Sequence, residues 1–448
     1  MTSHEWWHNA DLRMATAVGD GWRLFNDLYL RAQTDADLLA LTRRTRLAQS
    51  LTHAARTEHF APHLGGRQIT ADNAEATLAA LPVLEKDVLR HTPEAITTGL
   101  VDPWDVLKVR TSGTTGEPVW IIHDDTKLTE STAANLRMLD AYGLQPGLRV
   151  IRATADLRHG LVDYETMPFF GQATVLQVNM STATPGDAAF LTRLCAEFKP
   201  DVLWGQPVEI LLAALRQNEG TIDFPKFKAV LTHGDSLDAR ARATIADVFG
   251  CPHYDLYGLQ EFGRVGWECP QSPGTYHIDE ERVSIDVQGD GQVLITSLTN
   301  TAMSLLRYRP GDGGELLTEP CPCGRPHVRL TKIEGRKRAL VADADGQLVN
   351  IKPLRLILEV QPLHRWQVRQ NEAGCLDVLI APESPADGDE LARDLYAALK
   401  NTMRLRELTV RPVELAELTT ASGKAPLFQL LATQEALSAA VVDNATSW

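Results

Sequence analysis

The feature that most constrains this chain is a short run of hydroxyl-bearing residues and glycines, Thr111-Ser112-Gly113-Thr114-Thr115-Gly116. Apolar residues typical of short strands stand on both sides of it, at 106–109 and 119–122. Glycine lets the backbone approach a ligand closely, and successive backbone N–H groups can then hold an anion, with the hydroxyls as further donors. Composition alone favours an ordinary Ser/Thr/Gly-rich hairpin turn. The run is not a P-loop, because the chain has no Gly-x-x-x-x-Gly-Lys-Ser/Thr string.

The order of these residues, continued to Pro118, resembles the signature loop of the adenylate-forming enzymes. This superfamily contains acyl-CoA synthetases, peptide-synthetase adenylation domains and luciferases. The resemblance implies that residues 111–116 bind the phosphates of ATP.

Length and charge limit the classes of protein to which the chain can belong. At 448 residues it exceeds the size at which a single core keeps growing, so we expect at least two domains. The net charge of −14 argues against nucleic acid or an anionic membrane as the main partner. No apolar run has the length of a membrane span, and no secretory signal is visible. With these features, six cysteines predict a reducing compartment, and we expect the cytoplasm.

Periodicity predicts how the chain is organised. Residues 11–60 are expected to be helical, and between 127 and 330 helical and strand patterns alternate, which favours α/β layers with a largely parallel sheet. The helical patterns are at 127–142, 187–198, 207–218 and 238–249, and the strand patterns at 150–153, 173–176, 202–204 and 229–231.

Beyond residue 335 the pattern changes to that of a small α+β domain. We expect strands at 338–342, 364–370, 375–380 and 407–413, and helices at 353–360 and 387–403. The predicted domains are therefore 1–334, which would bind ATP and the acyl group, and 335–448, a mobile lid.

An enzyme that activates a carboxylic acid with ATP must bind the ribose, coordinate Mg²⁺ and place positive charge near the reacting carboxylate. The segment Tyr257-Gly258-Leu259-Gln260-Glu261 resembles the Tyr-Gly-x-x-Glu motif of the superfamily. The resemblance implies that Tyr257 stacks near adenine, that Gly258 lines the acyl pocket, and that Glu261 is catalytic and holds Mg²⁺. Without the resemblance, such a glutamate is ordinarily a surface residue.

Two further segments are candidates for the acyl and ribose sites. His233 and Gly234 follow an apolar run at the carboxyl end of a predicted strand, where α/β proteins bind ligands, although a structural turn explains them equally well. With them, Trp204, Gly205, Tyr257 and Gly258 are expected to border the acyl pocket. The segment 307–312 resembles the Tyr-Arg-Thr-Gly-Asp motif, with proline in place of threonine, which implies that Asp312 accepts both ribose hydroxyls.

The C-terminal part supplies two cationic candidates. The segment 333–337 resembles the hinge of the superfamily, which implies rotation of the lid about 335–337 and contact of Arg336 with ribose or phosphate. Lys337 stands where close relatives usually carry aspartate. The segment 420–425 resembles the C-terminal Gly-Lys motif, so Lys424 is the candidate adenylation lysine, bridging the carboxylate and the α-phosphate.

The whole set is most similar to the phenylacetate–CoA ligase-like branch, over about residues 40–430. Cys269, His277, Cys321 and Cys323 form a Cys-x7-His…Cys-x-Cys set. Thiolate and imidazole ligands suit structural Zn²⁺, and buried free cysteines are the alternative.

The resemblance implies an ATP- and Mg²⁺-dependent ligase that converts a carboxylic acid, expected to be aromatic, into its acyl-adenylate and then transfers the acyl group to CoA. A carrier-protein thiol or an amine as acceptor stays open. A non-catalytic nucleotide or acyl-ligand sensor is a second alternative. Dimers are common among the enzymes resembled, which leaves a homodimer open.

Overall fold

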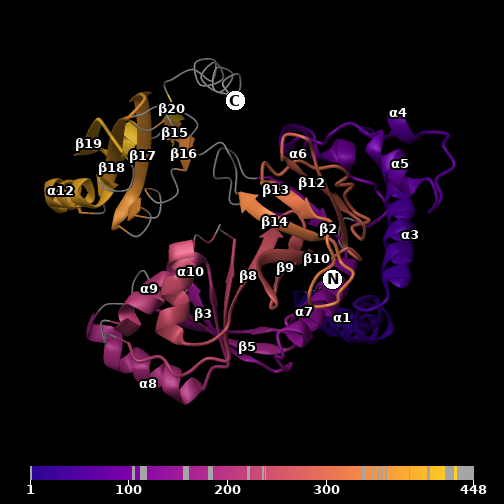
Figure 1. Ribbon diagram of the computed structural model, residues 1–448, viewed down its shortest axis with the longest axis horizontal. Coiled ribbons are helices and arrows are strands. Elements are labelled where there is room, and N and C mark those ends of the chain that lie inside the picture. The colour runs from indigo at the N-terminus through magenta and orange to yellow at the C-terminus, as the bar shows by residue number, and fades with distance from the viewer. Residues whose placement is uncertain are drawn as a thin grey trace. The chain divides into compact units, whose positions relative to one another are not determined.

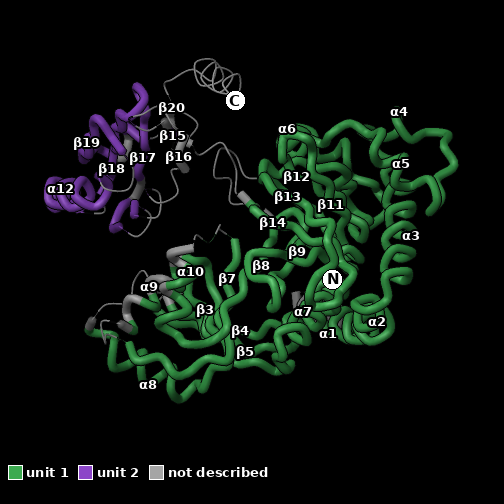
Figure 2. Tube along the Cα trace, in the orientation of Figure 1, with its two compact units in different colours: residues 1–111, 119–335 green, residues 112–118, 336–448 purple. Residues whose placement is uncertain are grey.

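The computed structural model describes most of the chain (Figure 1). It divides into two compact units: unit 1 consists of residues 1–111 and 119–335, and residues 336–448 belong to unit 2 (Figure 2). The described residues are 3–102, 106–110, 119–154, 161–179, 185–218, 222–234, 237, 239–334, 340–342, 344, 348–350, 354, 357–358, 361–382, 384–400, 404–418 and 428–430.

Unit 1 begins with helices, as the pattern of 11–60 predicts. Asp35 caps α3 (Ala36–Ala54) by accepting a hydrogen bond from the backbone N–H of Leu38. Leu47 and Leu51 of α3 belong to the largest core cluster. The other helical elements are α1 (Ser3–Leu24), the π-helix η1 (Phe25–Tyr29), α2 (Leu30–Ala32), α4 (Ala61–Leu64), α5 (Ala74–Ala79), α6 (Lys86–His91) and the 3₁₀ helix η2 (Pro93–Ile96).

A ten-stranded sheet forms the centre of unit 1, with the order β13-β14-β10-β9-β8-β7-β6-β3-β5-β4. Its strands are β3 (Arg149–Thr154), β4 (Val162–Met167), β5 (Ala173–Asn179), β6 (Val202–Gly205), β7 (Ala229–His233), β8 (His253–Leu259), β9 (Gly263–Cys269), β10 (Ser272–Ile278), β13 (Gly313–Leu317) and β14 (Arg329–Glu334). The predicted strands at 150–153, 173–176, 202–204 and 229–231 are confirmed as β3, β5, β6 and β7.

The sheet is parallel in one half only. Neighbours from β5 through β3, β6 and β7 to β8 pair in parallel, whereas β4 and the strands from β9 to β14 pair antiparallel. The expectation of a largely parallel sheet therefore holds only for the part in which helices alternate with strands. Antiparallel strands need only short turns between them, and such turns leave no helical period in the sequence to announce them.

Helices cover both faces of the parallel half (Figure 1). Ile151 and Leu203 pack against α8 (Ala188–Phe198), α9 (Pro207–Asn218) and α10 (Ala239–Phe249). Val150 and Val202, one residue earlier in each strand, pack against α7 (Thr126–Ala141) on the opposite face. Successive side chains of a strand alternate between faces, so strands covered on both sides are apolar throughout. The 3₁₀ helix η4 (Pro185–Asp187) precedes α8.

Two hairpins complete unit 1. Strands β1 (Leu107–Arg110) and β2 (Trp120–His123) pair antiparallel, which confirms strands on both flanks of the hydroxyl-rich run. Strands β11 (Val283–Val287) and β12 (Val293–Ser297) form the other hairpin.

Unit 2 is a small α+β unit. Its four-stranded sheet has the order β19-β18-β17-β20, and Leu395 and Leu399 of α12 (Gly388–Leu399) share a core with β17 and β18. The remaining elements are β15 (Leu340–Ala342), β16 (Leu348–Asn350), β17 (Leu363–Glu372), β18 (Cys375–Pro382), η6 (Pro385–Asp387), β19 (Glu407–Pro412), η7 (Leu415–Leu418) and β20 (Phe428–Leu430). None of the helices described in either unit is both long and apolar enough to cross a membrane.

A buried ionic cluster connects the helices of unit 1 to its sheet. Arg137 of α7 donates to Asp279 and to Glu281, each at 2.5 Å, and all three side chains are inaccessible to solvent. Arg264 of β9 also donates to Asp279, at 3.1 Å. The arginines hold the pKa of Asp279 and Glu281 below the usual range, although burial alone would raise it.

We predict that Arg137→Met lowers the free energy of unfolding by about 3–5 kcal/mol, because buried Glu281 then loses its main cation and buried Asp279 loses one of the arginines around it. Chemical denaturation measures this loss. The matched control is Arg23→Met, which removes an exposed ion pair with Asp20 and should cost less than about 1 kcal/mol. Equal losses in the two variants would contradict the role assigned to the cluster.

Candidate active site

Two tyrosine–carboxylate pairs join two segments of unit 1 that lie far apart in the sequence. Tyr257 lies on β8, and Asp312 directly precedes β13. The hydroxyl of Tyr257 donates to Asp312 Oδ2 at 2.9 Å. The second bond runs from the later segment to the earlier one: the hydroxyl of Tyr308 donates at 2.8 Å to Oε1 of Glu261, which follows the end of β8. All four side chains are buried. Segments 257–261 and 308–312 each supply one donor and one acceptor, so neither can shift without breaking a bond; we call this arrangement the tyrosine brace.

The backbone around Tyr308 explains why its side chain points inward. Arg307 adopts a φ of 49°, which is uncommon for a residue other than glycine. Leu84 brackets the tyrosine: its N–H donates to the carbonyl of Arg307 at 3.1 Å, and its carbonyl accepts from the N–H of Arg309 at 3.0 Å. Tyr308 is completely buried as a result.

Glu261 has a cation as a second neighbour. Lys86 is the first residue of α6, and its Nζ lies 3.6 Å from Glu261 Oε1, the atom that Tyr308 contacts. The Lys86 side chain is 15% exposed and that of Glu261 only 4%. The distance fits an electrostatic contact better than a hydrogen bond. Glu261 is therefore a buried carboxylate held between a hydroxyl and an ammonium group.

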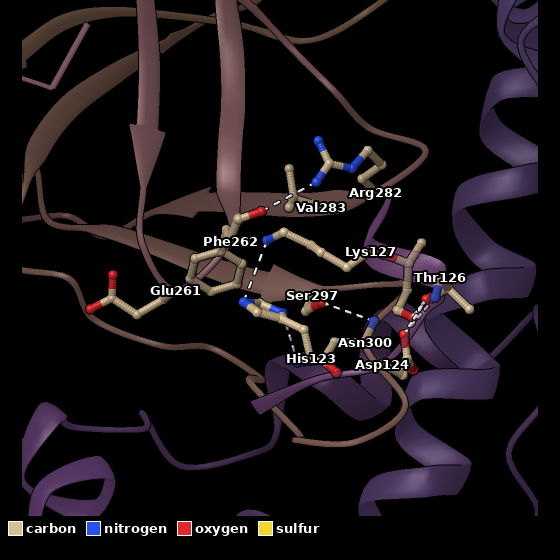
Figure 3. A pocket seen from close by; sticks show the side chains of 11 residues that line it. His123, Asp124, Thr126, Lys127, Glu261, Phe262, Arg282, Val283, Ser297 and Asn300 are labelled. Carbon is tan, nitrogen blue, oxygen red and sulfur yellow. Dashed lines mark hydrogen bonds between the residues drawn. The ribbon is translucent and has the colours of Figure 1, made fainter. Parts of the chain in front are cut away.

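A small cavity lies next to Glu261 and Phe262 (Figure 3). Its volume is about 10 Å³, which is room for a single water. Lys127 reaches into it from α7, with Nζ 3.5 Å from Nε2 of His123 at the end of β2. Burial and the nearby Arg282 lower the pKa of Lys127 well below its usual value, and burial with Lys127 lowers that of His123 to about 3. The strand that leaves the hydroxyl-rich run therefore ends beside Glu261.

The residues expected at the acyl pocket lie at the carboxyl ends of parallel strands. Trp204 and His233, at the ends of β6 and β7, have ring centroids 5.2 Å apart. Gly205 needs to be glycine, since a Cβ there would lie 2.8 Å from the carbonyl oxygen of Ala153; at Gly258 a Cβ would lie 3.0 Å from that of Gly263. Gly234 follows His233 with a positive φ.

A polar cluster around Asp255 supports the carboxyl end of β7. Asp255 of β8 accepts from the hydroxyls of Thr232 at 2.5 Å and Tyr276 at 2.7 Å. Its backbone N–H donates to Glu268 at 2.7 Å. Burial raises the pKa of Asp255 to about 6, although both hydroxyls lower it. Thr232 directly precedes His233, so the cluster fixes the strand end that carries that histidine.

The predicted cysteine–histidine set is assembled in space. The Sγ atoms of Cys269 and Cys321 are 3.5 Å apart, those of Cys321 and Cys323 are 3.3 Å apart, and His277 Nε2 is 3.2 Å from Cys323 Sγ. All four ligand atoms lie within 4.8 Å of one another. No disulfide joins them. The fold therefore brings the four residues of this sequence set to one point.

The structure covers only part of the predicted nucleotide site. It brings Tyr257, Glu261 and Asp312 together, and it places Trp204 beside His233. Residues Thr111, Ser112, Gly113, Thr114, Thr115, Gly116, Arg336 and Lys424 lie outside the described residues. Sequence reasoning missed the roles of Lys127, His123 and Arg282. Only the position of His123 at the end of the strand after the signature loop could have suggested its place.

Comparison with known proteins identifies relatives. No family model matches the chain. It is 27% identical over 323 residues to the phenylacetate–coenzyme A ligase of Thermus thermophilus (67% of this chain and 70% of the relative). It is 26% identical over 407 residues to that of Aromatoleum evansii (84% and 90%). The chain is a relative of the phenylacetate–CoA ligases. The resemblance to that branch is thereby confirmed.

A solved structure confirms the fold class. The structure matches 2-hydroxyisobutyryl-CoA ligase in the postadenylation state in complex with 2-HIB-AMP, with a TM-score of 0.58 and 17% identity over 90% of this chain and 92% of that one. The same enzyme in complex with 2-HIB-AMP and CoA matches with the same TM-score over 93% and 94%. The chain thus has the mixed α/β fold of adenylate-forming ligases.

Proposed function

We propose that this chain is an AMP-forming acid ligase that activates a carboxylic acid with ATP and transfers the acyl group to CoA. The observation that carries the proposal is the tyrosine brace, in which Asp312 and Glu261, the carboxylates of two sequence motifs resembling those of this enzyme class, are each bonded to a tyrosine of the other motif. The relationship to phenylacetate–CoA ligases supports the same reaction.

The proposed reaction has two steps. In the first, a carboxylate oxygen of the acid attacks the α-phosphorus of ATP, the bond to the β-phosphate breaks, and pyrophosphate leaves. In the second, the CoA thiolate attacks the acyl carbonyl, and AMP leaves with the bonding electron pair. Both steps move negative charge onto a leaving phosphate, which fixed positive groups stabilise.

Each residue has a role that suits its chemistry. Asp312 would accept hydrogen bonds from both ribose hydroxyls. Tyr257 holds Asp312 in place through its hydroxyl, and its ring would stack near adenine. The residues 111–116 would donate to the phosphates. Glu261 offers the hard oxygen ligand that Mg²⁺ prefers, and Mg²⁺ would neutralise charge on the phosphates. Tyr308 donates to one oxygen of Glu261 and so orients the carboxylate.

The lid belongs to the proposal. Residues 1–334 would bind ATP and the acyl group, and residues 335–448 would rotate about 335–337 between the two steps. Arg336 would contact ribose or phosphate. Lys424 would bridge the carboxylate and the α-phosphate in the first step and withdraw before the second. The compartment we propose is the cytoplasm, and a homodimer is left open.

We predict that Lys424→Ala lowers acid-dependent ATP–pyrophosphate exchange by about 10²–10³-fold, the usual cost of removing one charge-stabilising donor. Transfer from a supplied acyl-adenylate to CoA should survive, because Lys424 acts only in the first step. The matched control is Lys400→Ala, a lysine after α12 in the same unit, which should change neither rate.

Unchanged exchange in Lys424→Ala would remove this lysine from the mechanism. With wild-type protein, AMP and pyrophosphate released without an acyl-CoA product would exclude CoA as the acceptor, and parallel assays with a carrier protein and with amines would then identify it. If no acid stimulated pyrophosphate release, the alternative of a non-catalytic nucleotide or acyl-ligand sensor would be favoured.

We also propose that the cysteine–histidine set holds structural Zn²⁺. Three sulfurs and one imidazole nitrogen are the donors of a closed tetrahedral site. With Zn–S bonds of about 2.3 Å, the sulfurs of such a tetrahedron stand about 3.8 Å apart, close to the 3.5 Å and 3.3 Å of this structure. The set lies on β9, β10 and the segment before β14, so the ion would tie these neighbouring parts of the sheet together.

We predict about one Zn²⁺ per chain, measured by elemental analysis of the purified protein. Cys323→Ser should remove the metal and lower the melting temperature, because one of four ligands is lost. The matched control is Cys195→Ser, a buried cysteine among apolar side chains of α8, which should retain the metal. Metal-free wild-type protein would contradict the proposal and leave the four residues as three free thiols and an imidazole.

A further inference from the structure

The acyl end of the site carries a cation. Arg152 of β3 stands opposite Trp204 on β6 and opposite Gln177 on β5 in the parallel ladder. Residues at the same register point to the same face of a sheet. The three side chains therefore share the face on which Trp204 lies 5.2 Å from His233. This face is where the acyl group is expected.

The flat groups at this place are stacked on one another. The Phe170 and Trp204 rings are parallel within 9°, with centroids 5.3 Å apart. The guanidinium carbon of Arg152 lies 5.3 Å from the centroid of Trp204. A guanidinium held against an indole keeps its plane and its N–H groups in fixed directions. An aromatic ring with an oxygen substituent fits such a surface, because the ring stacks and the oxygen accepts.

Several polar groups at this face lack partners among the described residues. The indole N–H of Trp204 and Nε2 of His233 are buried and make no hydrogen bond there. Gln177, on the same face, is a buried polar side chain that is 4% exposed. Buried polar groups are nearly always satisfied, so these point to a ligand with polar atoms.

Arg152 keeps donors for such a ligand. Its Nη1 donates to Glu165 Oε1 at 3.2 Å, and about a third of each side chain is exposed (34% and 33%). That bond uses one of five N–H donors in the guanidinium. Among the described residues, the ion pair holds the arginine in place and leaves the rest of its fork without a hydrogen-bond partner.

We propose that the activated acid is an aromatic acid with an oxygen acceptor on its ring — a hydroxyl, a carbonyl or a second carboxylate — bound by Arg152 with Gln177. This inference rests on the proposed function, since it assigns the acid to the ligase reaction. It distinguishes this chain from an enzyme for an unsubstituted aryl acid, whose ring offers no acceptor to the guanidinium N–H groups of Arg152.

The test compares kcat/KM for pyrophosphate release with phenylacetate, benzoate, and ring-hydroxylated and ring-carboxylated derivatives of both. Wild type should prefer the best oxygenated acid over its unsubstituted parent by about 10–100-fold, the worth of a hydrogen bond to a charged group. Arg152→Met keeps the stem on Trp204 and removes the donors, so it should lower kcat/KM for the oxygenated acids and abolish that preference.

The matched control is Arg149→Met, at the start of the same strand, where the guanidinium lies over Phe198 instead. It should keep the wild-type preference. Arg152→Lys, which retains the charge but loses the fork, should restore part of the preference and serves if the Met variant does not fold. A wild-type preference for unsubstituted acids, or an equal loss for all acids in Arg152→Met, would overturn the inference. If none of the tested acids stimulates pyrophosphate release by wild type, the proposed function fails as well.

Discussion

The tyrosine brace is the contact on which the site depends. Tyr257 and Asp312 bond across two segments, and Tyr308 and Glu261 bond across the same segments in the other direction. Each bond has a charged acceptor and lies in the interior, where such hydrogen bonds are strong. The carboxylates proposed for ribose and for Mg²⁺ therefore keep a fixed relative position before any nucleotide arrives. Such preorganisation spares the reaction the cost of ordering these groups.

The parallel half of the sheet brings the acyl end of the site to the same region. Arg152, Trp204 and His233 lie at or within two residues of the carboxyl ends of β3, β6 and β7, and parallel strands place these ends at one edge. Below the site, the ionic cluster around Arg137 joins α7 to the segment before β11. Charges buried so deeply stabilise only as a complete set, which makes this cluster a strict condition for the packing of the helices on the sheet.

Sequence reasoning predicted the fold well where the period is clear. The alternation from 127 to 249 became α7 to α10 with β3 to β7, because apolar strands and amphipathic helices have different periods. The antiparallel strands from β9 to β14 were not predicted, because the short turns between them leave no helical period in the sequence to mark their ends. The cysteine–histidine set was predicted from residue type alone, and its members do meet in space.

The contacts that hold the site could not be predicted in this way. Nothing in the motifs shows that Tyr308 bonds Glu261 rather than a backbone group, because that depends on the turn at Arg307. Lys127 and His123 belong to no motif, and only packing brings them together beside Glu261. Long-range side-chain contacts follow from the fold, whereas a motif records only neighbours in the chain.

The central claim is that Asp312, fixed by Tyr257, recognises the ribose of a bound nucleotide. The most direct measurement compares the equilibrium affinities of ATP and 2′,3′-dideoxy-ATP for wild type and for Asp312→Asn. The account predicts that wild type binds ATP more tightly by about 10–100-fold, as hydrogen bonds to a charged acceptor require, and that the variant no longer distinguishes the two nucleotides. Equal affinities of wild type for both nucleotides would contradict it.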